Sequence, residues 1–152
     1  MTLQFYERKP KGFVSQVTVV GCYCLYEDKI LLLKRSPKSF LGEKWYLPGG
    51  KREEGESCLE GAKRELHEEC GIELLPKKLS HLITLYLEFP DYSYDFSIYR
   101  CTFKVEPTLH LDLREHTEAK WLIHIEALKL PLIHGGTTIL EYCLQKQEKS
   151  PM

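Results

Sequence analysis

The sequence predicts an α/β fold in which a mixed β-sheet is covered by helices. Strand-like segments alternate with two helical segments along the chain, and short polar turns between several strands indicate hairpins. The chain has 152 residues, of which 43 % are hydrophobic and 28 % are charged. We therefore expect one domain over residues 1–152 with a core of ordinary size.

The first part of the chain is predicted to form strands. Residues 1–12 are polar and basic and are expected to be an N-terminal arm or an edge strand. Residues 16–26 and 30–35 are rich in aliphatic and aromatic residues, so each predicts a strand. A short strand over residues 45–47 is expected to end at the Pro-Gly-Gly sequence of residues 48–50.

The clearest helix follows these glycines. Ser57 and Glu60 form a capping-box pattern, in which each side chain accepts a hydrogen bond from the other residue's backbone amide. Gly71 suits the left-handed conformation that commonly ends a helix. The expected buried face recurs at helical spacing and consists of Leu59, Ala62, Leu66 and Cys70.

The remainder predicts three more strands and a last helix. Residues 79–88 and 94–105 are expected to form strands around a turn at Pro90 and Asp91. A further strand is expected over residues 120–125, and a helix over residues 137–147.

Acidic residues are concentrated on the first predicted helix. Residues 50–72 hold seven glutamates and four basic residues, whereas the net charge of the whole chain is -1. At about 100° per residue, Glu65, Glu68 and Glu69 lie within about 100° of one another. One interpretation is a solvated acidic face. The other is a site for a hard divalent cation, because carboxylates without neighbouring Cys or paired His favour Mg²⁺ or Mn²⁺ over Zn²⁺.

Two glycines precede this acidic helix and favour the second interpretation. Gly49 and Gly50 have no side chains, so their backbone carbonyls and amides can approach a metal or a phosphate closely. A glycine loop that leads into a carboxylate-bearing helix suits a substrate whose phosphates are bridged to the protein by metal.

The segment from Gly50 to Ile72 also matches a known motif. The Nudix box reads G-x5-E-x7-R-E-U-x-E-E-x-G-U, where U is apolar. Its nine fixed positions are all matched without a gap, by Gly50, Glu56, Arg64, Glu65, Leu66, Glu68, Glu69, Gly71 and Ile72. The chain thus resembles the Nudix hydrolase family, and its MutT-like members in particular. The resemblance implies the Nudix fold, an α/β/α sandwich with a mixed β-sheet and a strand–loop–helix–loop catalytic motif.

The resemblance also implies a metal site. It assigns Glu65, Glu68 and Glu69 as ligands of Mg²⁺, with Mn²⁺ as a possible substitute, and adds the backbone carbonyl of Gly49. Glu56 would support the metal ligands or Arg64 from the loop.

The acid–base roles implied by the resemblance involve three side chains. Arg64 would orient Glu65 through a charge-assisted hydrogen bond. Glu65 would be a metal ligand, the general base, or both. Glu115 lies in a downstream loop where MutT-type members often supply a further carboxylate, so it is a candidate ligand or base. Glu118 is its rival, and an exposed loop acid is the alternative for both.

Three residues are candidate substrate contacts. Arg35 ends a predicted strand and can contact a phosphate, and the backbone of Gly50 can approach a phosphate closely. His134 precedes the last helix, at a place where MutT-type enzymes have a polar residue that recognises the base. One of the aromatic residues between positions 86 and 96 could stack on a base, although most are expected in the core or on strand faces.

The resemblance implies hydrolysis of a nucleoside diphosphate linked to another moiety. A nucleoside triphosphate, possibly oxidised and cleaved to monophosphate and pyrophosphate, is the favoured substrate, and an ADP-ribose or dinucleotide pyrophosphatase is the alternative. An inactive Nudix-fold nucleotide-binding regulatory module is a further alternative, but such modules usually have damaged boxes.

The remaining features concern partners and location. A nearly neutral charge argues against a nucleic-acid polymer as partner. No apolar run reaches the roughly 18 residues that span a membrane, and no secretory signal is recognisable. Six cysteines without a C-x-x-C pair favour reduced thiols over disulfides, so we expect a cytoplasmic protein that is a monomer or a homodimer.

Overall fold

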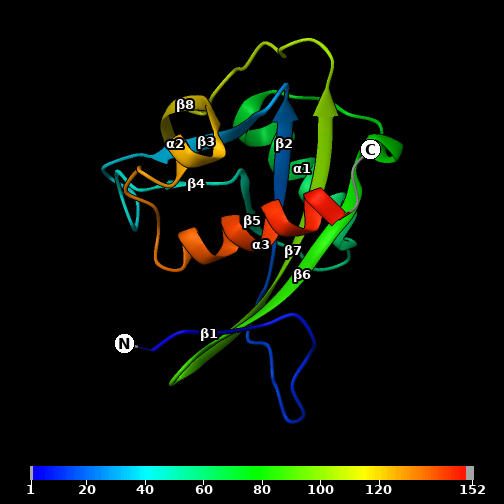
Figure 1. Ribbon diagram of the computed structural model, residues 1–152, viewed down its shortest axis with the longest axis vertical. Coiled ribbons are helices and arrows are strands. Elements are labelled where there is room, and N and C mark those ends of the chain that lie inside the picture. The colour runs from blue at the N-terminus through cyan, green and yellow to red at the C-terminus, as the bar shows by residue number, and fades with distance from the viewer. Residues whose placement is uncertain (1, 150–152) are drawn as a thin grey trace.

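The computed structural model describes residues 2–149, and an eight-stranded mixed sheet forms its centre (Figure 1). Six strands follow the order β1 (Gln4–Tyr6), β6 (Ser80–Phe89), β7 (Tyr92–Phe103), β2 (Thr18–Tyr26), β3 (Lys29–Arg35) and β4 (Trp45–Tyr46). Two further strands lie off this path: β5 (Gly49–Lys51) pairs with β2, and β8 (His116–Ile123) pairs with β3. Strands β2 and β7 pair in parallel, whereas β2 and β3 pair antiparallel, so the sheet is mixed as predicted.

The two faces of the sheet are covered by different helices. Successive strand residues point to opposite faces, and in β2 Cys22 and Cys24 pack with α1 (Cys58–Cys70). Tyr23 and Leu25 instead belong to the cluster of α3 (Gly136–Lys149) and α2 (His124–Ala127). Figure 1 shows α3 across the near face and α1 behind the sheet. The fold is the predicted α/β/α sandwich.

Strands β2 and β3 diverge soon after their hairpin. Their ladder contains two pairs, Leu25 with Ile30 and Tyr26 with Lys29. Beyond this ladder, β5 pairs with the free edge of β2, and β8 pairs with β3. This divergence places β5, the end of β3 and the start of β8 around the acidic helix.

Helix α1 has the predicted ends and the predicted buried face. The Ser57 hydroxyl accepts a hydrogen bond from the Glu60 amide at 3.0 Å, and the Glu60 carboxylate accepts one from the Ser57 amide at 2.8 Å. Gly71 adopts a φ of 71° at the C-terminal cap. Leu66 is fully buried against the sheet. Over residues 2–149, no helix has the length and apolarity needed to cross a membrane.

Two predicted strand boundaries are wrong for the same physical reason. The chain was expected to leave the sheet at residues 48–50, but Gly49–Lys51 forms β5 against β2. The strand expected over residues 120–125 instead begins at His116 and ends at Ile123, where α2 begins. In both cases the free edge of a distant strand supplies the pairing, and local composition does not reveal that edge.

Other boundaries lie close to their predicted positions. The turn at Pro90 and Asp91 joins β6 to β7. The N-terminal segment contributes Gln4–Tyr6 as an edge strand against β6.

We expect Leu66→Ala to lower the free energy of unfolding by about 2–5 kcal/mol, because it opens a cavity where α1 meets the sheet. Leu75 is 61 % exposed, so Leu75→Ala should change it by less than about 0.5 kcal/mol. Urea denaturation followed by circular dichroism measures both. Equal costs would contradict the assignment of Leu66 as an anchor of α1.

Candidate active site

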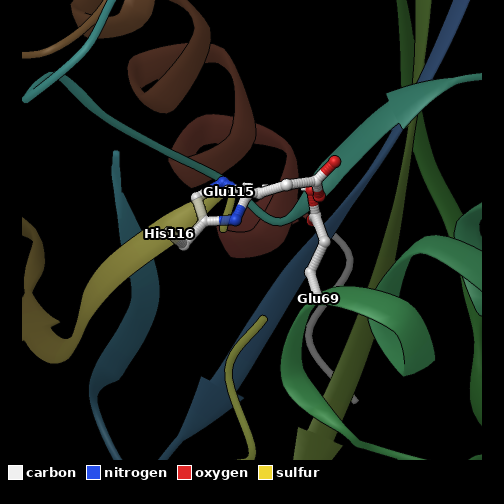
Figure 2. Close-up of side chains that lie close together, drawn as sticks. All are labelled: Glu69, Glu115 and His116. Carbon is white, nitrogen blue, oxygen red and sulfur yellow. Dashed lines mark ion pairs between the residues drawn. The ribbon is translucent and has the colours of Figure 1, made fainter. Parts of the chain in front are cut away.

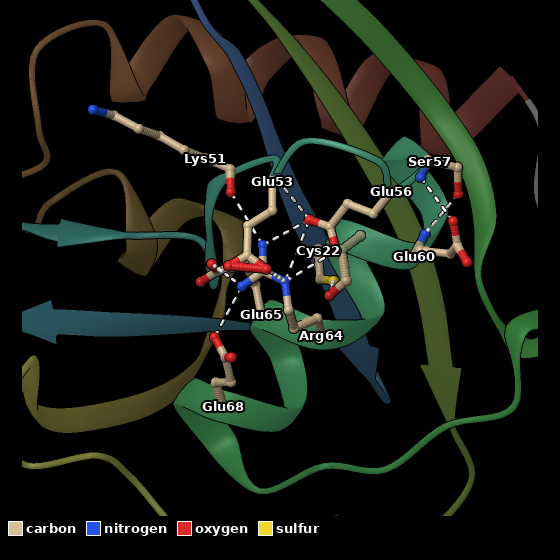
Figure 3. A network of polar contacts seen from close by, with 10 residues as sticks. Cys22, Lys51, Glu53, Glu56, Ser57, Glu60, Arg64, Glu65 and Glu68 are labelled. Atoms are coloured by element: carbon tan, nitrogen blue, oxygen red, sulfur yellow. Dashed lines mark hydrogen bonds and ion pairs between the residues drawn. The ribbon is translucent and has the colours of Figure 1, made fainter.

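The side chain of Arg64 is the centre of a network of glutamates (Figure 3). Its Nη2 and Nε donate hydrogen bonds to the two carboxylate oxygens of Glu56 at 2.8 and 3.1 Å. Its Nη1 donates to Glu65 at 2.8 Å and to Glu68 at 2.9 Å. Glu53 adds an ion pair at 3.3 Å. One guanidinium therefore contacts four carboxylates.

The loop between β5 and α1 makes this network possible. It turns so that the backbone amide of Glu53 donates to Glu56 at 2.8 Å, and the carbonyl of Lys51 accepts from Arg64 at 3.1 Å. Hydrogen bonding from Arg64 lowers the pKa of the Glu56 carboxyl below its usual range. The contacts with Glu56 and Glu65 raise the pKa of Arg64, so the guanidinium stays charged.

Glu69 lies deeper than the rest of the acidic cluster. It is 4 % exposed, so a solvated acidic face is the wrong interpretation for this residue. The backbone N–H of Gly49 donates to its Oε1 at 2.7 Å. Burial, with the nearby charge of Glu65, raises the pKa of Glu69 well above its usual range, and the bond from Gly49 opposes this rise. Burial also raises the pKa of Glu65, against the opposing effect of Arg64.

Gly49 and Gly50 of β5 allow the close approach of these carboxylates. A Cβ on Gly50 would lie 2.7 Å from the carboxylate carbon of Glu65, and a Cβ on Gly49 would overlap the carbonyl oxygen of Val20. A side chain is therefore excluded at Gly49, where it would meet backbone, and at Gly50 it would displace the Glu65 carboxylate.

A cavity of about 490 Å³ opens onto this cluster. Its lining comes from β3, β5, α1 and the start of β8, together with loop residues, and comprises Arg35, Ser39, Gly49, Gly50, Lys51, Glu53, Arg64, Glu65, Glu69, Glu115 and His116. Cations at Arg35 and Lys51 thus share the cavity with the carboxylates of Glu65 and Glu69. Such a lining can hold a divalent cation beside a phosphate chain.

Three of these residues form a candidate cation site (Figure 2). Glu69, Glu115 and His116 each offer one ligand atom, and these atoms lie within 4.8 Å of one another. His116 is 5 % exposed, and its buried Nδ1 has no hydrogen-bond partner among the described residues. Its Nε2 lies 3.9 Å from Glu69 Oε2.

The chemistry of these donors fits a divalent cation. Carboxylate oxygens suit Mg²⁺ and Mn²⁺. Burial and the charge of Arg35 lower the pKa of His116 to about 4, so its ring is neutral at pH 7, which is the form that can bind a metal.

Several of the predicted residues lie outside this cavity. Glu56 holds Arg64 and does not line it, and Glu68 is 54 % exposed in its side chain and contacts Arg64. Glu118 lies in β8 opposite Lys34, whereas its rival Glu115 lines the cavity. His134 is exposed, with its ring 5.6 Å from that of Phe89, and lines neither this cavity nor the aromatic cavity described below.

Some cavity residues were missed from the sequence. Glu53 and Lys51 stood among many exposed charges, and Ser39 lay in an unremarkable loop. His116 was missed because its segment was expected to be a loop before a strand at residues 120–125, and nothing in that pattern indicated that its ring would be buried. In the structure β8 begins at His116, which pairs with Arg35 at a register shift, and Glu115 directly precedes it.

An α/β/α sandwich with carboxylates and basic residues in one cavity suits a metal-assisted enzyme that acts on phosphorylated substrates. The NUDIX domain model matches residues 15–142. The chain therefore belongs to the Nudix family and is a Nudix hydrolase.

Individual relatives support this assignment. The Nudix hydrolase YvcI of Bacillus subtilis is 28 % identical over 132 residues, which is 85 % of this chain and 80 % of that protein. The 8-oxo-dGTP diphosphatase of Proteus vulgaris is 34 % identical over 82 residues, or 54 % of this chain and 71 % of that protein. The solution structure of the E. coli ORF135 protein superposes with a TM-score of 0.73 at 27 % identity and covers 93 % of this chain and 98 % of that one.

Arg64→Lys should lower the free energy of unfolding by roughly 1.5–3 kcal/mol, because one ammonium cannot replace the forked contacts of the guanidinium. Arg114→Lys is the matched control, since the Arg114 side chain is 90 % exposed, and should change it by less than about 0.5 kcal/mol. Urea denaturation distinguishes them, and an unchanged Arg64→Lys midpoint would refute the importance of the network.

Glu69→Gln should raise the melting temperature of metal-free protein, because it removes a buried carboxylate. Adding Mg²⁺ at 100 times its dissociation constant should stabilise the wild type by about 2.7 kcal/mol and the variant by much less. Scanning calorimetry in EDTA and in MgCl₂ measures both effects, with exposed Glu54→Gln as control. An equal metal-induced shift in wild type and Glu69→Gln would show that Glu69 is not a ligand.

Proposed function

We propose that this Nudix hydrolase is a Mg²⁺-dependent pyrophosphohydrolase that converts a nucleoside triphosphate to a monophosphate and pyrophosphate. The observation that carries the proposal is the single cavity in which Glu65, Glu69 and Glu115 meet Arg35 and Lys51. The carboxylates suit a hard cation, and the two basic residues suit the phosphates of the substrate. The named activity of the Proteus vulgaris relative supports the same reaction class.

Glu65, Glu69 and Glu115 would hold the cation, with the neutral ring of His116, the Gly49 carbonyl and a reoriented Glu68 as further donors. The cation, when bound, supplies charge neutralisation of the phosphates and activation of water. Glu56 is better assigned as a positioning residue, because Arg64 donates hydrogen bonds to both of its carboxylate oxygens.

Proton transfer falls to Glu65 or Glu115. Arg64 binds Glu65 Oε1 at 2.8 Å and thereby fixes the direction of that carboxylate. Glu115 is exposed and lines the same cavity from the segment before β8, so it can accept a proton from a water that attacks phosphorus. Arg35 and Lys51 would orient the phosphates for in-line attack.

We also propose that the protein acts in the cytoplasm on small nucleotides. All six cysteines are free thiols, and five of them are buried. Free thiols are typical of proteins from reducing compartments.

A substrate panel with Mg²⁺ tests the activity. Pyrophosphate should be released from nucleoside triphosphates, and Glu69→Gln should abolish this release while the protein stays folded. Glu115→Gln should lower kcat by roughly 10- to 1,000-fold if Glu115 transfers a proton. Glu118→Gln is the matched control and should retain activity.

The panel also includes oxidised triphosphates, ADP-ribose and diadenosine polyphosphates. Cleavage of ADP-ribose or a dinucleotide alone would replace the proposal with a dinucleotide pyrophosphatase. Metal binding without any turnover would favour a nucleotide-binding regulatory module.

A further inference from the structure

A second cavity, of about 340 Å³, adjoins the carboxylate cavity. The two share Arg35, Gly49, Gly50 and Lys51, so the second begins where a phosphate chain in the first would end. Its volume lies within the range of roughly 300–1,000 Å³ that is usual for small-molecule sites. A substrate whose phosphates lie beside Glu65 can therefore place its remaining group in the second cavity.

The lining of the second cavity is mainly aromatic and aliphatic. Beyond the four shared residues it comprises Val17, Val19, Val20, Phe40, Leu41, Tyr46, Tyr92, Tyr94, Phe96 and Ile133. Among the described residues that line it, none is Asp, Asn, Glu or Gln, and its two charged residues, Arg35 and Lys51, belong to the end that it shares with the carboxylate cavity. Those side chains present fixed donors or acceptors to the edge of a base, whereas a tyrosine hydroxyl can rotate and serve as either.

Two aromatic side chains of this cavity are exposed. Phe40 is 83 % exposed and Tyr92 is 41 % exposed, and they come from the loop after β3 and from β7. A large aromatic side chain that borders a cavity and is open to solvent offers a face on which a flat ring can stack.

Arg35 holds the backbone of the loop at Phe40. The Arg35 Nε donates a hydrogen bond to the Phe40 carbonyl at 2.8 Å. The next residue, Leu41, has a φ of 61°, a left-handed conformation that a leucine rarely adopts. Arg35 thus lines the carboxylate cavity and also holds the loop that carries the exposed ring of Phe40.

We infer that the second cavity binds the base of the nucleotide by stacking, with Phe40 as a principal contact, and does not read the edge of the base. This inference rests on the proposed function. It predicts an enzyme that accepts purine and pyrimidine triphosphates, oxidised or unoxidised, with little selection among them. Apolar pockets discriminate related groups by about 100-fold at most, whereas sites that hydrogen-bond a defining group reach about 10⁴-fold or more.

The first test compares kcat/KM for the four common triphosphates and for dGTP against 8-oxo-dGTP, all with Mg²⁺. The values should lie within about 100-fold of one another. A preference of more than about 100-fold for any one base would overturn the inference while leaving the proposed hydrolysis intact. Absence of turnover with every triphosphate would count against the proposed function, and the binding test below would then decide the inference.

The second test measures binding of non-hydrolysable α,β-methylene triphosphates by calorimetry. Phe40→Ala should weaken binding of every base by about 5- to 100-fold, and Phe40→Tyr should restore it, because stacking requires the ring. Phe40→Leu keeps the side chain apolar and should remain weak. Because Phe40 is exposed, none of these variants removes a core contact.

Two controls separate stacking from other effects. Leu113→Ala removes another exposed side chain, 69 % accessible and outside the cavity, and should bind like the wild type. Inorganic pyrophosphate has no base, so its affinity with Mg²⁺ should be the same for wild type and Phe40→Ala. Wild-type nucleotide affinity in Phe40→Ala, or an equal loss of pyrophosphate affinity, would refute the stacking role.

Discussion

The site depends on the compensation of several glutamates by the single guanidinium of Arg64. Carboxylates that crowd on one helix repel one another, and burying them adds a desolvation cost. Arg64 contacts Glu53, Glu56, Glu65 and Glu68, so its charge and its hydrogen bonds are shared across the loop and the helix. Glu69 lies beyond the reach of these contacts and is held by the Gly49 amide. Among the carboxylates of the cluster, Glu69 is therefore the one whose buried charge a bound cation would compensate most.

The backbone positions this charge through glycine and through strand divergence. Gly49 and Gly50 bring β5 against both β2 and the acidic helix, where a Cβ on Gly49 would overlap the Val20 carbonyl and one on Gly50 would displace the Glu65 carboxylate. The early separation of β2 from β3 then leaves room for the carboxylate cavity beside Arg35 and for the aromatic cavity beyond it. The two adjoining cavities thus arise from one irregular region of the sheet.

Much of the architecture followed from local sequence. The capping box at Ser57, the stop at Gly71 and the buried face through Leu66 are short-range features, and each appears as predicted. The intact Nudix box placed the carboxylates and Arg64 on α1, and the family assignment is confirmed. The limits of β5 and β8 were wrong because they depend on the edges of β2 and β3, which lie 25 or more residues away in sequence. His116 and the exposed ring of Phe40 depend on tertiary packing alone, so no spacing rule could have indicated them.

The short ladder between β2 and β3 has a mechanical consequence. Glu69 belongs to the part of the molecule built on β2 and β5, whereas Glu115 and His116 belong to the part built on β3 and β8. A cation held by all three would act as a cross-link between these parts, closing a loop of the chain between α1 and β8. Because these ligands come together only in the folded chain, the bound cation would stabilise the folded state in which the loop is closed. The same ion that serves the substrate would therefore also brace the two walls of the site at a fixed separation.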